Sequence, residues 1–122
     1  MASLDRLRGK RILVVEDEFL LADDLSRALR DAGAEVIGPA PSVQKAQRLL
    51  ESAGPFDAAV LDVNLRDVLS YSIARTLQAQ ATAFLFTTGY DQGLIPDQFK
   101  TVPWVQKPYG PRDLLDKLAD LL

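Results

Sequence analysis

The chain has 122 residues, a length typical of one domain with a substantial hydrophobic core. It contains neither cysteine nor histidine, which excludes disulfides, zinc-thiolate sites and histidine chemistry, so any reactive site must use carboxylates, hydroxyls, lysine and a hard metal ion. The net charge of -3 comes without a basic cluster, and no apolar run is long enough for a membrane span or a signal peptide, so we expect a cytoplasmic protein that binds neither nucleic acid nor membrane.

Short apolar segments alternate with amphipathic segments along the chain. The apolar segments predict strands at residues 12–15, 34–40, 58–61, 84–88 and 104–106. The amphipathic segments predict helices at residues 21–32, 43–53, 71–80 and 111–122, with Ser42 as the N-cap of the second. This alternation predicts an α/β domain with a doubly wound, five-stranded parallel sheet covered on both faces. We expect a single domain over residues 1–122, with residues 1–9 as an N-terminal extension.

The segment between the last two predicted strands provides poorly for a fourth helix. Only thirteen residues, 90–102, are available for the helix and both of its loops, and Gly93 and Pro96 interrupt them. We therefore expect this fourth helix to be short or mobile.

Polar side chains follow four of the predicted strands at the point where each strand ends. Ligands of such sheets lie beyond the carboxyl ends of the strands, so these residues are candidates for a common site. Each has an ordinary explanation by itself, as a helix-capping acid, a strand threonine or a solvated lysine, but their conjunction at one sheet edge favours a functional site. The candidates are Glu16, Asp17, Glu18, Asp62, Asn64, Thr87, Thr88 and Lys107.

Crowded carboxylates repel one another, and a hard cation held through oxygen, most plausibly Mg²⁺, relieves that repulsion. A hydroxyl and a lysine on the opposite side suit a phosphoryl group that shares the ion. In this setting a carboxylate can act as a nucleophile and form an acyl phosphate.

Four segments in this order, "ILVVEDE", "AAVLDVNL", "FTTG" and "VQKP", together resemble the receiver domain of bacterial two-component response regulators, which has a flavodoxin-like (CheY-like) fold. The resemblance covers essentially the whole chain. It implies that Asp62 is the phosphoacceptor and that Glu16 and Asp17 form the acidic pair of an Mg²⁺ site. Asp17 would bind the ion most directly, and the backbone carbonyl of Asn64 would contribute a further ligand.

The same resemblance assigns a hydroxyl and a lysine to the phosphoryl group. Thr88 rather than Thr87 matches the family's hydroxyl, because a small residue follows it in the family and Gly89 fits. Lys107 matches the lysine that pairs with the phosphoryl group, and its bond to Pro108 is commonly cis in the family.

Three more positions match residues that modulate the switch in receivers. Trp104 stands where the family usually has a Tyr or Phe whose rotamer reports activation. Asn64 and Tyr90 are placed to tune the rate at which water removes the phosphoryl group.

The chain also departs from the common receiver pattern. Arg66 and Ser70 stand where proline and glycine usually follow the phosphoacceptor, so the loop into the third helix should take a different path. The segment "AFLFTTGY" resembles the "PFxFATGY" signature of a receiver subgroup, often stand-alone and often paired with kinases of the HWE or related classes. Ala83 replaces the proline of that signature and Thr87 replaces its alanine.

The resemblance implies a regulator rather than an enzyme, with at most weak autophosphorylation and autodephosphorylation. A partner histidine kinase or phosphotransfer protein would donate a phosphoryl group to Asp62 in the presence of Mg²⁺, and a protein-binding surface would change. Two alternatives stay open. One is a receiver-like binding module that is never phosphorylated, which Arg66, Ser70 and Trp104 favour. The other is a haloacid-dehalogenase-type phosphatase, which "DVNLR" faintly echoes but which would need a second acid where Asn64 stands.

Overall fold

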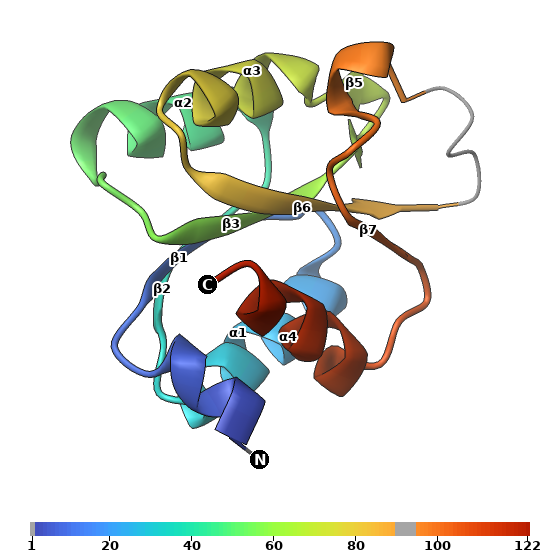
Figure 1. Ribbon diagram of the computed structural model, residues 1–122. Coiled ribbons are helices and arrows are strands. Elements are labelled where there is room, and N and C mark those ends of the chain that lie inside the picture. Colours follow the sequence, from blue (N-terminus) through green and yellow to red (C-terminus); the bar gives the residue numbers. More distant parts are fainter. Residues whose placement is uncertain (1, 90–94) are drawn as a thin grey trace.

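The computed structural model of the protein describes residues 2–89 and 95–122. A five-stranded parallel sheet, in the order β2-β1-β3-β6-β7, forms the middle of three layers (Figure 1). Its strands are β1 (Arg11–Val15), β2 (Glu35–Ala40), β3 (Ala58–Asp62), β6 (Ala83–Thr88) and β7 (Trp104–Gln106). The α-helices are α1 (Phe19–Asp31), α2 (Val43–Ser52), α3 (Tyr71–Ala79) and α4 (Pro111–Asp120). Within the described ranges, no helix is long and apolar enough to cross a membrane.

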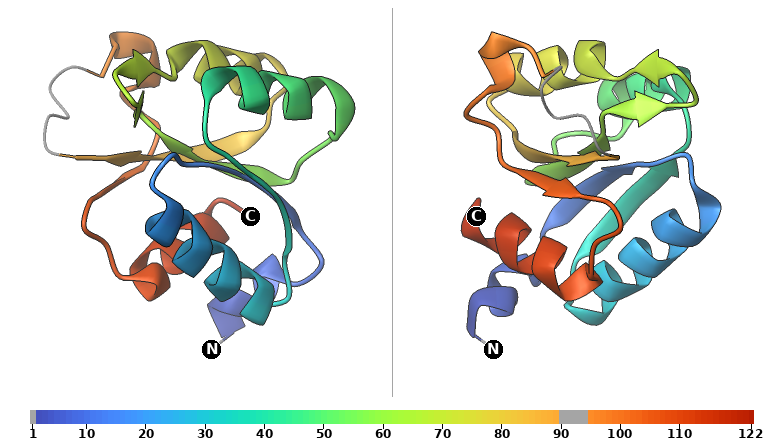
Figure 2. Two further views of the ribbon diagram at one scale, coloured as in Figure 1. Left: turned by 180° about the vertical axis from the view of Figure 1, so that it is seen from behind. Right: turned by 90° about the vertical axis from the view of Figure 1, so that its right-hand side faces the viewer.

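Successive side chains of each strand point to opposite faces of the sheet. They form two hydrophobic cores, one on each face. Helices α2 and α3 cover one face, while α1 and α4 cover the other (Figure 2). Along β6, for example, Phe84 and Phe86 enter the first core and Leu85 enters the second. A strand that is buried on both faces needs apolar residues at every position, which explains the continuous apolar runs in the sequence. The predicted doubly wound sheet is confirmed.

The connections place a switch point between β1 and β3. The chain leaves β1 to form β2 on one side of it and then returns to form β3 on the other side. Helices that follow β1 and β3 therefore cover opposite faces, and the carboxyl ends of these two strands border an opening where ligands bind in such sheets.

The N-terminal residues are part of the helical layer beside α1 and α4. They form a 3₁₀ helix, η1 (Ala2–Leu7), and Leu7 is completely buried in the second core. Residues 1–9 were predicted as an extension, and the burial of Leu7 shows how the described part of that segment is fixed to the domain.

Between β6 and β7 the described residues, 95–103, contain a single 3₁₀ turn, η3 (Asp97–Phe99). This turn brings Phe99 into the first core, where its ring stacks on Tyr71 at 5.6 Å and meets Phe86 edge-on at 5.7 Å. These ring contacts fix the described part of the segment to the first core. Residues 90–94, which include Tyr90, lie outside the described part of the chain.

A small hairpin follows β3, where the sequence predicted only an altered loop. Strands β4 (Asn64–Leu65) and β5 (Val68–Leu69) pair antiparallel and are joined by Arg66 and Asp67. Both turn residues have positive φ, 52° and 69°, as a two-residue turn with the twist of a hairpin requires. Because neither residue is glycine, the turn depends on stabilising contacts, and the side chain of Asn64 accepts a hydrogen bond from the Asp67 backbone N–H at 2.7 Å.

Candidate functional site

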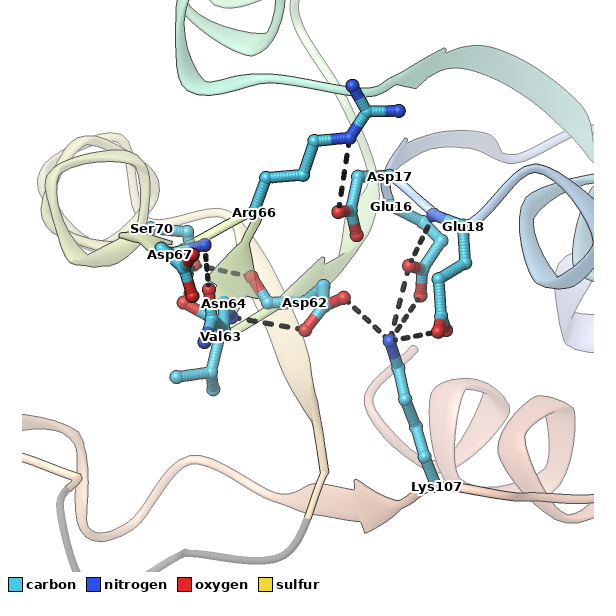
Figure 3. A network of polar contacts seen from close by, with 10 residues as sticks. All are labelled: Glu16, Asp17, Glu18, Asp62, Val63, Asn64, Arg66, Asp67, Ser70 and Lys107. Carbon is cyan, nitrogen blue, oxygen red and sulfur yellow. Dashed lines mark hydrogen bonds and ion pairs between the residues drawn. The ribbon is translucent and has the colours of Figure 1, made fainter.

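Parallel strands bring three charged side chains together at the carboxyl edge of the sheet (Figure 3). Glu16 follows β1, Asp62 is the last residue of β3, and Lys107 follows β7. Lys107 Nζ lies 2.7 Å from Asp62 Oδ2, 3.1 Å from Glu16 Oε1 and 3.1 Å from Glu18 Oε2. Glu16 and Asp62 are almost completely buried, whereas more than half of the Glu18 side chain is exposed. The site therefore has a buried carboxylate pair bridged by one lysine.

Asp17 lies on the side of this cluster away from Lys107. Carboxylate oxygens of Glu16, Asp17 and Asp62 all lie within 4.8 Å of one another, close enough to bind one metal ion. Arg66 of the hairpin turn approaches Asp17 from outside, with 3.7 Å between Arg66 Nε and Asp17 Oδ2.

The pKa of Glu16 is raised to about 8, first by burial and next by the charge of Asp62, while the charge of Lys107 opposes the rise. Burial alone would lower the pKa of Lys107, but its hydrogen bond to Asp62 and the charges of Asp62 and Glu16 raise that pKa above 10.5. Lys107 is therefore a permanent cation at neutral pH, and one lysine does not fully offset the carboxylates around it.

The donor set of this site fits a hard divalent cation. It offers oxygen atoms only, from three carboxylates of which two are nearly buried, and Lys107 alone leaves an excess of negative charge among them. A divalent cation would relieve that excess, and Mg²⁺ prefers carboxylate oxygens with the remaining positions filled by water. Glu16, Asp17 and Asp62 are the side chains that would hold it.

Residues of the segment between β3 and α3 hold both the side chain and the backbone of Asp62. The Asn64 backbone N–H donates to Asp62 Oδ1 at 3.1 Å, and the buried Ser70 hydroxyl donates to the Asp62 carbonyl oxygen at 2.6 Å. Ser70 also donates to the carbonyl oxygen of Val63 at 3.2 Å. The sequence singled out Ser70 only as a departure from glycine, and its role as an anchor of Asp62 was not foreseen. A serine directly before a predicted helix was the available signal.

The two threonines at the end of β6 take different positions. The carbonyl oxygen of Thr88 accepts a hydrogen bond from the Lys107 backbone N–H at 2.7 Å, which places Thr88 beside Lys107. Thr87 pairs in register with Asp62, and its buried Oγ1 has no hydrogen-bond partner among the described residues. Both hydroxyl-bearing side chains are almost completely buried.

Two of the remaining candidates, Glu18 and Trp104, belong to the described part of the chain. The sequence predicted no separate role for Glu18 within its acidic run. In the structure, Glu18 Oε2 accepts a hydrogen bond from Lys107 Nζ. Trp104 is 40% exposed on β7, the edge strand of the sheet, and the Lys107–Pro108 bond is cis. Tyr90 lies outside the described residues.

Comparison with known proteins identifies the class to which this fold and site belong. No family model matches the chain. The solution structure of SdrG from Sphingomonas melonis Fr1 is 35% identical, with 93% of this chain and 96% of that chain covered and a TM-score of 0.80. The crystal structure of a CheY-like response regulator receiver domain protein from Methanospirillum hungatei JF-1 is 25% identical, with 92% of each chain covered and a TM-score of 0.80.

Curated proteins give the same assignment at lower coverage. The transcriptional regulatory protein PdtaR from Mycobacterium tuberculosis is 27% identical over 110 residues, which are 87% of this chain and 53% of PdtaR. The chain spans between 10% and 53% of the length of the curated relatives that it matches. The chain belongs to the CheY-like receiver domain family of response regulators, the modules of two-component signal transduction.

Proposed function

We propose that Asp62 is the phosphoacceptor of this receiver and that Mg²⁺ is required for the transfer. The proposal rests on one observation: the side chain of Asp62 lies close to those of Glu16, Asp17 and Lys107 at the switch point of the sheet. The alternatives are less well supported. A binding module without phosphorylation does not need a buried carboxylate pair with a lysine, and a phosphatase would need a second acid at Asn64.

The transfer would move a phosphoryl group from a histidine side chain of the donor to Asp62. An Asp62 oxygen forms a bond to phosphorus as the bond between phosphorus and a donor histidine nitrogen breaks, and the released imidazole takes its proton from solvent. Bound Mg²⁺ would supply positive charge to the oxygens of the transferring group. Lys107, whose Nζ lies 2.7 Å from Asp62 Oδ2, would pair with phosphoryl oxygens, and Thr88, whose carbonyl oxygen accepts from the Lys107 backbone N–H, would donate its hydroxyl.

The donor histidine must lie outside these 122 residues, since they contain no histidine. A histidine kinase or a phosphotransfer protein supplies this chemistry. The resemblance of the segment "AFLFTTGY" to the PFxFATGY signature supports a receiver of that subgroup and a kinase of the HWE class as its partner. The receiver itself would have at most weak autophosphorylation and autodephosphorylation activity, with Asn64 and Tyr90 tuning the latter.

The output of phosphorylation would be a changed protein-binding surface near β7. Contacts of Thr88 and Lys107 with the phosphoryl group would bias the loops that follow β6 and β7. Trp104 borders two surface grooves, one shared with Tyr109 and α4 and the other with Ile95 and Phe99. A change in its rotamer would therefore alter the shape of this surface.

Intact-mass measurement after incubation with Mg²⁺ and acetyl phosphate tests the proposal. We expect a gain of one phosphoryl group that hydroxylamine removes, as an acyl phosphate requires, and that is absent in Asp62→Asn. Asp67→Asn, a matched change at an exposed acid of the neighbouring turn, should leave the gain intact. Turnover of unrelated phosphoesters would instead support the phosphatase, and no gain with acetyl phosphate or with a cognate kinase would support the binding module.

A further inference from the structure

The two cations of the acidic site divide its carboxylates between them (Figure 3). Lys107 contacts three of the four acidic side chains, and the fourth, Asp17, faces Arg66 instead. Asp17 is also one of the three residues whose oxygens could hold a metal ion. The guanidinium of Arg66 therefore interacts with the one metal-capable carboxylate that Lys107 leaves free.

The hairpin turn holds Arg66 in this position. Its φ of 52° belongs to a backbone region that residues with a side chain rarely adopt. Hydrogen bonds from the Asp67 N–H to Asn64 Oδ1 and from the Asn64 N–H to Asp62 Oδ1 connect the turn to the phosphoacceptor. The strained turn and its anchor together hold Arg66 beside Asp17, at the outer side of the acidic site.

The contact between Arg66 and Asp17 is also easy to break. The Arg66 side chain is 80% exposed, whereas that of Asp17 is 13% exposed. An exposed arginine regains water when it leaves, so its ion pair contributes little free energy. A divalent cation that uses an Asp17 oxygen competes for the same charge and repels the guanidinium.

We propose that Arg66 is a tethered counter-ion that pairs with Asp17 in the metal-free protein, and that its displacement sets the Mg²⁺ affinity of the site. The identity of the ion rests on the proposed function. On this basis Arg66, which stands where receivers usually have proline, competes with the metal ion for the carboxylate of Asp17.

Calorimetric titration with Mg²⁺ of the wild type, Arg66→Ala and Arg66→Lys tests the inference. Arg66→Ala should bind Mg²⁺ about two- to five-fold more tightly, the range that loss of one exposed ion pair permits, and Arg66→Lys should stay near the wild type. Arg112→Ala is the matched control, because Arg112 Nε also lies 3.6 Å from an aspartate oxygen, that of Asp116 on α4. In ¹H–¹⁵N spectra of the wild type, the Arg66 Nε–H signal should shift when Mg²⁺ is added.

Five outcomes decide the matter. Tighter binding in Arg66→Ala alone supports the inference. Equal or weaker binding in Arg66→Ala overturns it, as does equal tightening in Arg112→Ala, which would reveal a general effect of net charge. An Arg66 Nε–H signal that does not respond to bound Mg²⁺ also overturns it. Absence of Mg²⁺ binding in every variant and the wild type would instead overturn the metal requirement of the proposed function, and the inference with it.

Discussion

Replacing Lys107 by methionine removes the cation that bridges the acidic site, and we expect it to destabilise the metal-free protein. Methionine retains much of the apolar stem, so the change tests charge more than packing. Lys107 Nζ lies 2.7 Å from Asp62 Oδ2 and 3.1 Å from Glu16 Oε1, and these acidic side chains are only 4% and 3% exposed. The substitution leaves two nearly buried carboxylates without this partner.

The expected loss follows from the burial of these groups. Removing one partner of a buried ion pair costs about 3–5 kcal/mol. Two features reduce the cost here. The Lys107 side chain is 16% exposed, and Glu16, whose pKa is raised to about 8 chiefly by burial, readily takes up a proton. We therefore expect the free energy of unfolding at neutral pH to fall by about 2–3 kcal/mol.

The difference between wild type and variant should widen at alkaline pH. In the wild type, folded Glu16 retains a proton between its ordinary pKa of 4.5 and about 8, where the unfolded chain has lost it, so stability falls as pH rises through this window. Lys107 opposes the rise in that pKa. Without Lys107 the folded pKa is higher still, and stability continues to fall above the wild-type window.

Urea unfolding followed by circular dichroism in EDTA, at about pH 6, 7, 8 and 9, measures this effect. Lys100→Met is the matched control, because Lys100 Nζ lies 3.3 Å from Asp97 Oδ1 and both side chains are exposed. The control should change stability by less than about 0.5 kcal/mol. A loss below about 1 kcal/mol for Lys107→Met, or a difference that stays constant with pH, would refute the reasoning.

The remaining predictions concern other residues around Asp62. Asp17→Asn should stabilise the metal-free protein by about 1 kcal/mol, by reducing like-charge repulsion, and should abolish the increase in melting temperature that Mg²⁺ gives the wild type. A lower melting temperature without metal would contradict this. Ser70→Ala should destabilise by about 1–2 kcal/mol in chemical denaturation, because it leaves the buried Asp62 carbonyl oxygen without this donor, while the exposed Ser72→Ala should be nearly neutral. Trp104 emission should change when Mg²⁺ and beryllofluoride are added together, and unchanged emission alongside calorimetrically proven binding would exclude coupling of Trp104 to the site.

The fold could be predicted because the local signals agreed with the overall topology. Strand β3 is buried at every position, and only a sheet covered on both faces explains such a run. Ser42 caps α2 as predicted, accepting a hydrogen bond from the Lys45 backbone N–H at 3.2 Å. The burial of Leu7 could not be predicted, because the short N-terminal segment has mixed charges and no helical periodicity long enough to indicate packing.

The site could be predicted only in part. Chain order and strand ends were enough to place Glu16, Asp62 and Lys107 at one edge of the sheet. Which carboxylate pairs with which cation was beyond sequence reasoning, because it depends on side-chain reach. The hairpin was also missed, since Arg66 and Asp67 lack the asparagine or glycine that usually marks a two-residue turn.

Lys107 contacts three carboxylates of the site and Arg66 contacts the fourth, that of Asp17. This pairing suggests how the proposed phosphorylation would change the contacts in the site. A phosphoryl group on Asp62 replaces one carboxylate charge with nearly two negative charges, so it competes strongly for Lys107. The contact with Glu18 is the easiest to give up, because the Glu18 side chain is 58% exposed and is rehydrated on release. Glu16 is nearly buried, and its raised pKa means that it either takes up a proton or uses its charge for the metal ion. A bound divalent cation would therefore free Lys107 to pair with the phosphoryl group, which explains physically why transfer to Asp62 should require Mg²⁺.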